Sequence, residues 1–187
     1  VSLQVVPTVR VAVRLDTGAV RARRAEQPAF AADGRVALSA LARIWVAPRP
    51  GALPRRLTRT ERPREYMPAW SPDGAWVAYV TWDESGGALW KARADGRGEP
   101  MRLSGRPALW TDPMWTPDGG ALVAITAPLA STLQVPNGAV PPDAQLAMVP
   151  SNGGMSRTVA RVPGARHPHF VRGDASRVWL SAGNTLV

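Results

Sequence analysis

Short apolar segments recur along the whole chain, and each is bounded by a turn rich in glycine, proline or aspartate. The segment "WVAYVTW" (76–82) is almost continuously apolar, and "LWKAR" (89–93) mixes apolar and basic residues. Apolar runs of this length and alternation with a period of two are typical of β-strands. The pattern therefore predicts an all-β protein.

One of these patterns is repeated four times. The copies are "PAFAADGRVALSA", "PAWSPDGAWVAYVTW", "PMWTPDGGALVAIT" and "PHFVRGDASRVWLSAG". They begin at Pro28, Pro68, Pro113 and Pro168, so that the prolines are 40, 45 and 55 residues apart. Two residues after each proline stands an aromatic residue: Phe30, Trp70, Trp115 and Phe170. Internal repeats of this length indicate a repeat architecture.

A tight turn follows the aromatic position. Three copies carry Asp-Gly at the same offset, at 33–34, 73–74 and 118–119, whereas the fourth has Gly173-Asp174 and one extra residue. Asp-Gly supplies the positive φ that a short hairpin turn requires. The first three copies then continue into a third segment ("RIWVAPRPG", "ALWKARADG", "QLAMVPSNGG") and a fourth ("PRRLT", "EPMRLS", "SRTVA").

Each unit of about 42 residues thus reads as four short antiparallel strands, which in the second copy are "PAW", "WVAYVTW", "LWKAR" and "PMRL". This is the pattern of a β-propeller blade. We expect 1–187 to form a single, partial β-propeller domain of about four blades, with units starting near 28, 68, 113 and 168. Because the final unit stops within a blade, we expect a fragment, or the ordered part, of a larger propeller.

Two segments depart from the repeat. Residues 127–144 contain four prolines and no strand periodicity, which predicts a loop inserted between the second and third strands of the third blade. Such insertions on rigid scaffolds often carry function, and a loop without a role is the alternative. The segment "VRVAVRLDTGAVRARR" before Pro28 reads as two strands around "DTG" that complete or cap a blade.

Composition narrows the class. The chain is 45% hydrophobic and 20% charged, values typical of a globular domain, and no apolar run is long enough to predict membrane insertion. The N-terminus lacks a signal-peptide pattern, although a leader already removed would leave the same picture. Without cysteine, the sequence has neither disulfides nor thiolate metal sites.

The net charge of +9 comes almost entirely from arginine, since Lys91 is the only lysine. This bias indicates a GC-rich genome more than selection for phosphate contacts. The basic clusters are Arg21, Arg23 and Arg24, then Arg55, Arg56, Arg59, Arg62 and Arg64. Aromatic residues are not interleaved with them, as a single-strand stacking platform requires. We expect no nucleic-acid partner.

Candidate catalytic and metal chemistry is sparse, and we expect no catalytic residue, metal or cofactor in this chain. His167 and His169 have the spacing of a metal-binding pair, but they lie in a copy of the innermost strand, where His169 replaces a filler residue. Ser181 lacks a nucleophile elbow, and Asp83 and Glu84 fit a solvated hairpin.

The tryptophans divide into two groups. Trp70 and Trp115 recur at the same position of their units, and Trp45 matches Trp90 in the third strand, which predicts packing between blades. Trp82 and Trp110 do not recur. They are therefore the candidate ligand-binding residues.

The string "PAWSPDG", an apolar strand, "LW", a "DG" turn and "RLT" or "RLS" together resemble the WD-repeat-like repeat of TolB-type β-propellers. The same repeat forms the propellers of prolyl oligopeptidases and dipeptidyl peptidases. The longer string "EYMPAWSPDGAWVAYVTWDESGGALWKARADG" resembles more narrowly the propellers that precede a metal-dependent amidohydrolase domain in bacterial secreted enzymes. This resemblance covers most of the chain.

The resemblance implies a periplasmic or secreted bacterial protein and leaves two functions open. The first is a noncatalytic propeller module of an amidohydrolase-like hydrolase, which gates substrate or binds the linked catalytic domain. The second is a stand-alone TolB-like propeller that binds a protein partner. In either case an unpaired blade edge would favour self-association.

Overall fold

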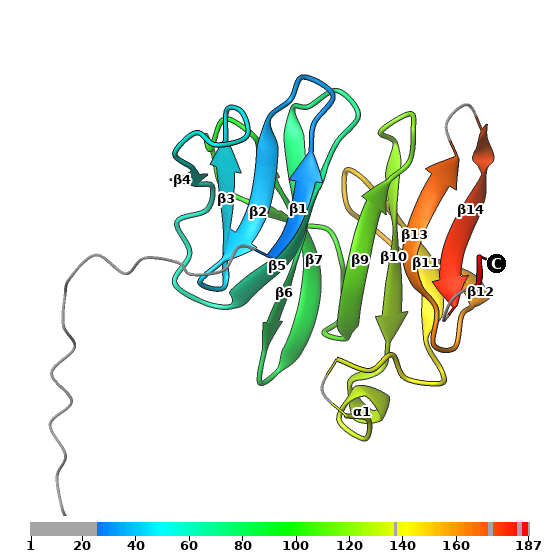
Figure 1. Cartoon of the computed structure of the whole chain (residues 1–187). Helices are drawn as coiled ribbons and strands as arrows, with labels where there is room; N and C mark the ends of the chain where they lie inside the picture. The colour runs from blue at the N-terminus through cyan, green and yellow to red at the C-terminus, as the bar shows by residue number, and fades with distance from the viewer. Residues whose placement is uncertain (1–25, 137, 172–173, 183–184, 187) are drawn as a thin grey trace, which may run out of the picture.

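The computed structural model describes residues 26–136, 138–171, 174–182 and 185–186, and within them the chain is almost entirely β-structure. The strands form four antiparallel sheets (Figure 1). The first sheet contains β1 (Glu26–Phe30), β2 (Val36–Ala40), β3 (Arg43–Ala47) and β4 (Arg55–Arg56). The second contains β5 (Arg64–Trp70), β6 (Trp76–Asp83), β7 (Gly86–Arg93) and β8 (Met101–Arg102). The third contains β9 (Leu109–Trp115), β10 (Ala121–Ala127), β11 (Gln145–Pro150) and β12 (Arg157–Arg161).

The fourth sheet contains β13 (Arg166–Val171), β14 (Asp174–Ala182) and β15 (Thr185–Leu186). In all four sheets the strands follow one another in chain order, so each sheet is a meander. We call the sheets blades 1 to 4. The predicted all-β architecture of antiparallel blades is confirmed.

The first strand of each blade lies innermost. β5 contacts β1 on one side and β9 on the other, and β9 in turn contacts β13. The blades consequently follow one another around a shared axis, as Figure 1 shows from blade 1 at the left to blade 4 at the right. This is the arrangement of a β-propeller.

The Asp-Gly turns close the first hairpin of blades 1 to 3 by local chemistry. In blade 2, the carboxylate of Asp73 accepts hydrogen bonds from the Ser71 hydroxyl at 2.5 Å and the Ala75 N–H at 3.0 Å. Gly74 has φ of +66°, a conformation that glycine adopts without strain. Asp118 makes the same pair of contacts with Thr116 and Gly120 in blade 3. The turn residues therefore act as the sequence predicts.

The hydrophobic core lies between the blades. Ile44 and Val46 of blade 1 pack with Val77 and Tyr79 of blade 2, and equivalent clusters fill the next two interfaces. Burial raises the pKa of the Tyr79 hydroxyl well above its usual range. Because blades 2 and 3 each bury apolar side chains against both of their neighbours, adjacent blades stabilise one another.

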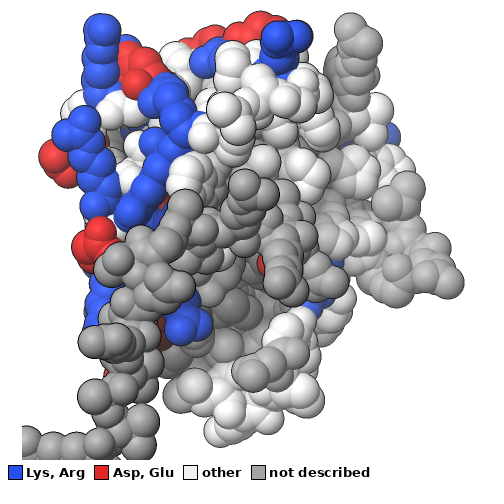
Figure 2. Space-filling view, turned by 60° about the vertical axis from the view of Figure 1, so that its left-hand side comes forward, with Lys and Arg blue, Asp and Glu red and all other residues white. Residues whose placement is uncertain are grey.

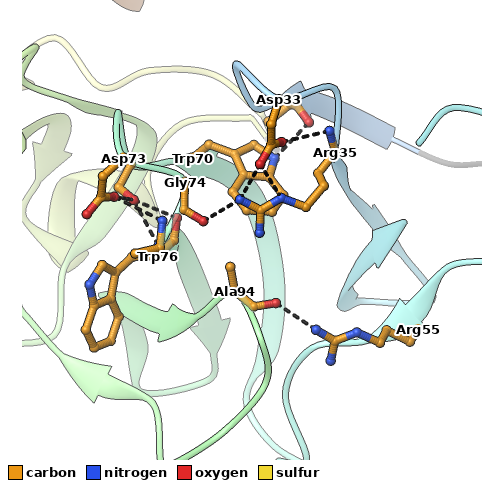
Figure 3. A network of polar contacts seen from close by, with 11 residues as sticks. Asp33, Arg35, Arg55, Trp70, Asp73, Gly74, Trp76 and Ala94 are labelled. Carbon is orange, nitrogen blue, oxygen red and sulfur yellow. Dashed lines mark hydrogen bonds and ion pairs between the residues drawn. The ribbon is translucent and has the colours of Figure 1, made fainter. Parts of the chain in front are cut away.

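Polar contacts reinforce the interface between blades 1 and 2 (Figure 3). The Arg35 guanidinium lies 4.6 Å from the centre of the Trp70 ring and donates a hydrogen bond of 2.7 Å to the Gly74 carbonyl. Arg55 likewise donates to the Ala94 carbonyl at 2.7 Å. Arg35 and Arg55 of blade 1 therefore use their guanidinium groups to bind backbone carbonyls of blade 2.

The structure differs from the expected strands in two places. β5 begins at Arg64, four residues before the predicted "PAW", because a register shift between Tyr66 and Ala69 lets Pro68 stay within the strand. Residues 128–144, which we call the insertion segment, join β10 to β11 and contain the single-turn helix α1 (Leu129–Thr132). The strands expected before Pro28 and the Gly173 turn lie outside the described residues.

Candidate binding cavity

The residue before each repeated proline has an unusual backbone conformation. Gln27, Met67, Asp112 and His167 all have φ between +51° and +53°. Non-glycine residues rarely adopt the left-handed region, and a residue before proline is also kept out of the helical region. Because the same conformation recurs in all four innermost strands, it is a regular feature of the blade rather than a local distortion. These residues, which we call the inner ring, lie where the four blades meet.

Side chains link the inner ring from blade to blade. The side-chain Oε1 of Gln27 accepts a hydrogen bond of 2.9 Å from the Met67 N–H. The Met67 sulfur lies 3.2 Å from the donating Asp112 N–H, and the Asp112 Oδ1 lies 3.1 Å from His167 Nδ1. The side chains of Gln27, Met67 and Asp112 thus each contact the equivalent residue of the following blade. The sequence signal for this ring was available, since each member directly precedes a repeated proline.

The two histidines do not act as a pair. His167 contacts Asp112, whereas the Nδ1 of His169 lies 3.1 Å from the carbonyl oxygen of His167. Within the described residues, no group of three or more histidine and acidic side chains is placed to hold a metal ion. Ser181 donates its hydroxyl proton to the carbonyl oxygen of Arg166, a structural contact between β14 and β13.

An open cavity of about 540 Å³ lies beside the inner ring. Gln27 and Met67 form part of its wall, and the insertion segment forms another part through Leu133 and Val140. Its volume is in the range of known ligand sites. We call this space the insertion cavity.

The two tryptophans that do not recur, Trp82 and Trp110, both line the insertion cavity. Trp82 comes from the end of β6 and is half-buried, while Trp110 comes from β9 and is 6% exposed. The indole nitrogen of Trp110 is buried, and among the described residues it has no hydrogen-bond partner. The structure therefore brings together both candidate residues and the insertion segment, three features that are separate in the sequence.

The insertion segment is held over the cavity by polar contacts. Arg166, on β13, donates a hydrogen bond to the Gly138 carbonyl. The Ser131 hydroxyl donates to the Asp143 carboxylate at 2.6 Å, which ties the two ends of the segment together. Leu133, at the exposed rim of the cavity, is 72% exposed. Arg166 is a site residue that sequence reasoning missed.

Basic side chains gather toward one side of the face shown in Figure 2. Of the cluster at 55–64, Arg55 contacts blade 2 and Arg56 donates to the Thr60 carbonyl within its own loop. Arg59, Arg62 and Arg64 are exposed. The cluster is thus partly structural. Within the described residues, no helix has the length and apolar character that a membrane crossing requires.

No protein-family profile matches the sequence, and no curated protein matches it. Solved structures do match. TolB from Acinetobacter baumannii has a TM-score of 0.61 and 15% identity over 82% of this chain and 39% of its own. A putative TolB from Agrobacterium tumefaciens has a TM-score of 0.63 and 18% identity, covering 79% of this chain and 54% of its own.

A puromycin-hydrolysing peptidase from Mycobacterium tuberculosis also matches, with a TM-score of 0.59 and 22% identity over 84% of this chain and 25% of its own. This chain therefore spans about half or less of each of these proteins. Identities this low establish the fold rather than the activity. The chain has the fold of the TolB-type β-propellers.

Proposed function

We propose that this chain is a noncatalytic β-propeller module that binds a segment of a protein partner in the insertion cavity. The observation that carries the proposal is the meeting of Trp82, Trp110 and the insertion segment around one open space. Aromatic and aliphatic walls supply the buried apolar contact on which peptide binding depends. The exposed Leu133 at the rim is available to a partner before binding.

Two settings fit such a module. In the first, the partner is the linked catalytic domain of an amidohydrolase-like hydrolase, and the propeller gates substrate. The similarity to a peptidase of which this chain spans 25% supports a hydrolase setting. In the second, the chain is part of a TolB-like propeller that binds a separate protein, which the two TolB structures support. Both settings imply a periplasmic or secreted location, which we also propose.

Binding is tested with synthetic peptides. The purified chain is screened against N-acetylated dodecamers with free carboxyl ends, and the dissociation constant of the tightest peptide is measured by titration calorimetry. Trp82→Ala and Leu133→Ala should each weaken binding at least tenfold, since each removes apolar contact area from the cavity. Met155→Ala is the matched control, because Met155 is 93% exposed in the connection between β11 and β12, away from the insertion segment. Equal affinity in wild type and Trp82→Ala would contradict the proposal.

The noncatalytic part is tested separately. The purified chain is assayed for hydrolysis of ester, peptide and amide substrates with and without added divalent metal ions. We expect no turnover under either condition. Metal-dependent turnover that disappears in His167→Ala would show that the inner ring is catalytic.

A further inference from the structure

Arg166 is the only charged side chain among the described residues that line the insertion cavity. It lies at the start of β13 and is half-buried. Its guanidinium donates to the Gly138 carbonyl, which is the only side-chain hydrogen bond that it makes within the described part of the chain. A guanidinium has five N–H donors in a planar fork. Donors therefore remain for a ligand that enters the cavity.

The acidic side chains of the surrounding elements do not neutralise this cation. Asp143 of the insertion segment accepts from Ser131, and Asp112 of the inner ring contacts Thr111 and His167. Within the described residues, no carboxylate lies within ion-pair distance of Arg166. The cavity thus combines one cation without an acidic partner and walls that are mainly apolar.

We infer that the insertion cavity binds the carboxyl terminus of a polypeptide, with the terminal carboxylate at Arg166 and an apolar side chain between Trp82 and Trp110. A carboxylate matches the guanidinium fork in charge and in planar geometry. One cation beside apolar walls fits a ligand with one negative charge next to an apolar group. The carboxyl terminus of a protein carries one negative charge beside an apolar side chain. A phosphate group carries more negative charge and would need more than one cationic side chain. This inference rests on the proposed function and names the part of the partner that is bound.

The indole nitrogen of Trp110 is closed to solvent, so Trp110 contributes its apolar ring, not its N–H, to the cavity wall. Trp110 forms part of the cavity wall and its nitrogen has no partner within the described residues. The Trp110 ring therefore supports the apolar contact that the inference assigns to it, and recognition of the carboxylate rests on Arg166.

The experiment compares two forms of one peptide. The tightest dodecamer of the peptide screen is synthesised with a free carboxyl end and with a carboxamide end, and both are titrated into the wild-type chain. We expect the carboxamide to bind at least tenfold more weakly, because it lacks the charge that Arg166 recognises. Equal affinities would overturn the inference while leaving the proposed function intact. A screen in which no peptide binds would contradict both.

Variants locate the effect. Arg166→Gln should lower the affinity for the free-carboxyl peptide at least tenfold and abolish the difference between the two forms, whereas Arg166→Lys should retain part of that difference. Arg161→Gln is the matched control, since Arg161 is an exposed arginine of β12 that does not line the cavity. An equal loss in Arg161→Gln and Arg166→Gln would show that net charge, rather than Arg166, recognises the peptide, and would overturn the assignment. The comparison of the two peptide forms on wild type stands even if Arg166→Gln fails to fold.

Discussion

The indole Nε1 of Trp115 donates a hydrogen bond of 3.1 Å to the carbonyl oxygen of Ala69, across the boundary between blades 2 and 3. Trp70 makes the same contact, also of 3.1 Å, with Ala29 across the boundary between blades 1 and 2. The tryptophans of the second and third repeats thus bind the innermost strand of the preceding blade. The predicted packing between blades is therefore confirmed for Trp70 and Trp115, whereas the indole nitrogens of Trp45 and Trp90 donate within their own blades.

The first prediction concerns this contact. Trp115→Phe keeps an aromatic ring but removes the N–H donor to Ala69, so the free energy of unfolding should fall by about 1–2 kcal/mol. Trp115→Ala also leaves a cavity and should cost about 3–5 kcal/mol. Urea denaturation measures both. Phe30→Leu is the control, because Phe30 occupies the same repeat position but is 65% exposed; we expect a change within about 0.5 kcal/mol. A larger loss in Phe30→Leu than in Trp115→Phe would contradict this account.

The second prediction concerns Arg35. Its guanidinium stacks on Trp70 and hydrogen-bonds the Gly74 carbonyl, so Arg35→Ala should lower the free energy of unfolding by about 1–2 kcal/mol. Arg35→Lys keeps the charge but loses the planar geometry and should recover only part of the loss. Arg49→Ala, at an exposed arginine of the β3–β4 connection, should change stability little. If Arg35→Lys were as stable as wild type, charge alone would account for the contact.

The third prediction concerns the buried carboxylate of Glu65, which is 1% exposed. It accepts hydrogen bonds from the Ile44 N–H at 3.1 Å and from the hydroxyls of Thr58 and Thr60 at 2.6 to 2.7 Å. Glu65→Leu leaves these donors without an acceptor and should lower the free energy of unfolding by about 3 kcal/mol or more. Glu65→Gln retains one acceptor oxygen, and threonine hydroxyls can turn to accept from its amide, so a smaller loss is expected. Thermal unfolding that ranks the two variants in the reverse order would refute this role.

The fourth prediction concerns acid stability. The hydrogen bond from Arg93, followed by that from the Arg97 N–H, lowers the pKa of Asp95 from 3.8 to about 2. Because the folded-state pKa is the lower one, the ionised carboxylate contributes stability above pH 3.8, and this contribution is lost as the pH falls toward about 2. Asp95→Asn should therefore show a shallower decline of the unfolding temperature between these two pH values. A slope identical to that of wild type would rule out a contribution from Asp95.

How far the site was predictable differs from residue to residue. Trp82 and Trp110 were separated from the other tryptophans because they break the repeat, and residues 127–144 stood out for the same reason. Arg166 gave no such signal, since it is one of many arginines and precedes an ordinary strand. The inner ring had a signal in the residue before each proline. Its four side chains have different chemistry, however, and only the fold places them in contact.

The strands and turns of a single blade follow from local sequence. The Asp-Gly turns and the apolar second strand act through neighbours a few residues away, so a short string of sequence is enough to predict them. The insertion cavity, by contrast, forms only when the blades pack together. Trp82, Trp110, Leu133 and Arg166 come from three blades and an insertion, and the packing of blade on blade sets the space between them. That packing depends on side chains that are far apart in the chain. No single repeat contains the cavity, and the sequence of one repeat therefore cannot predict it.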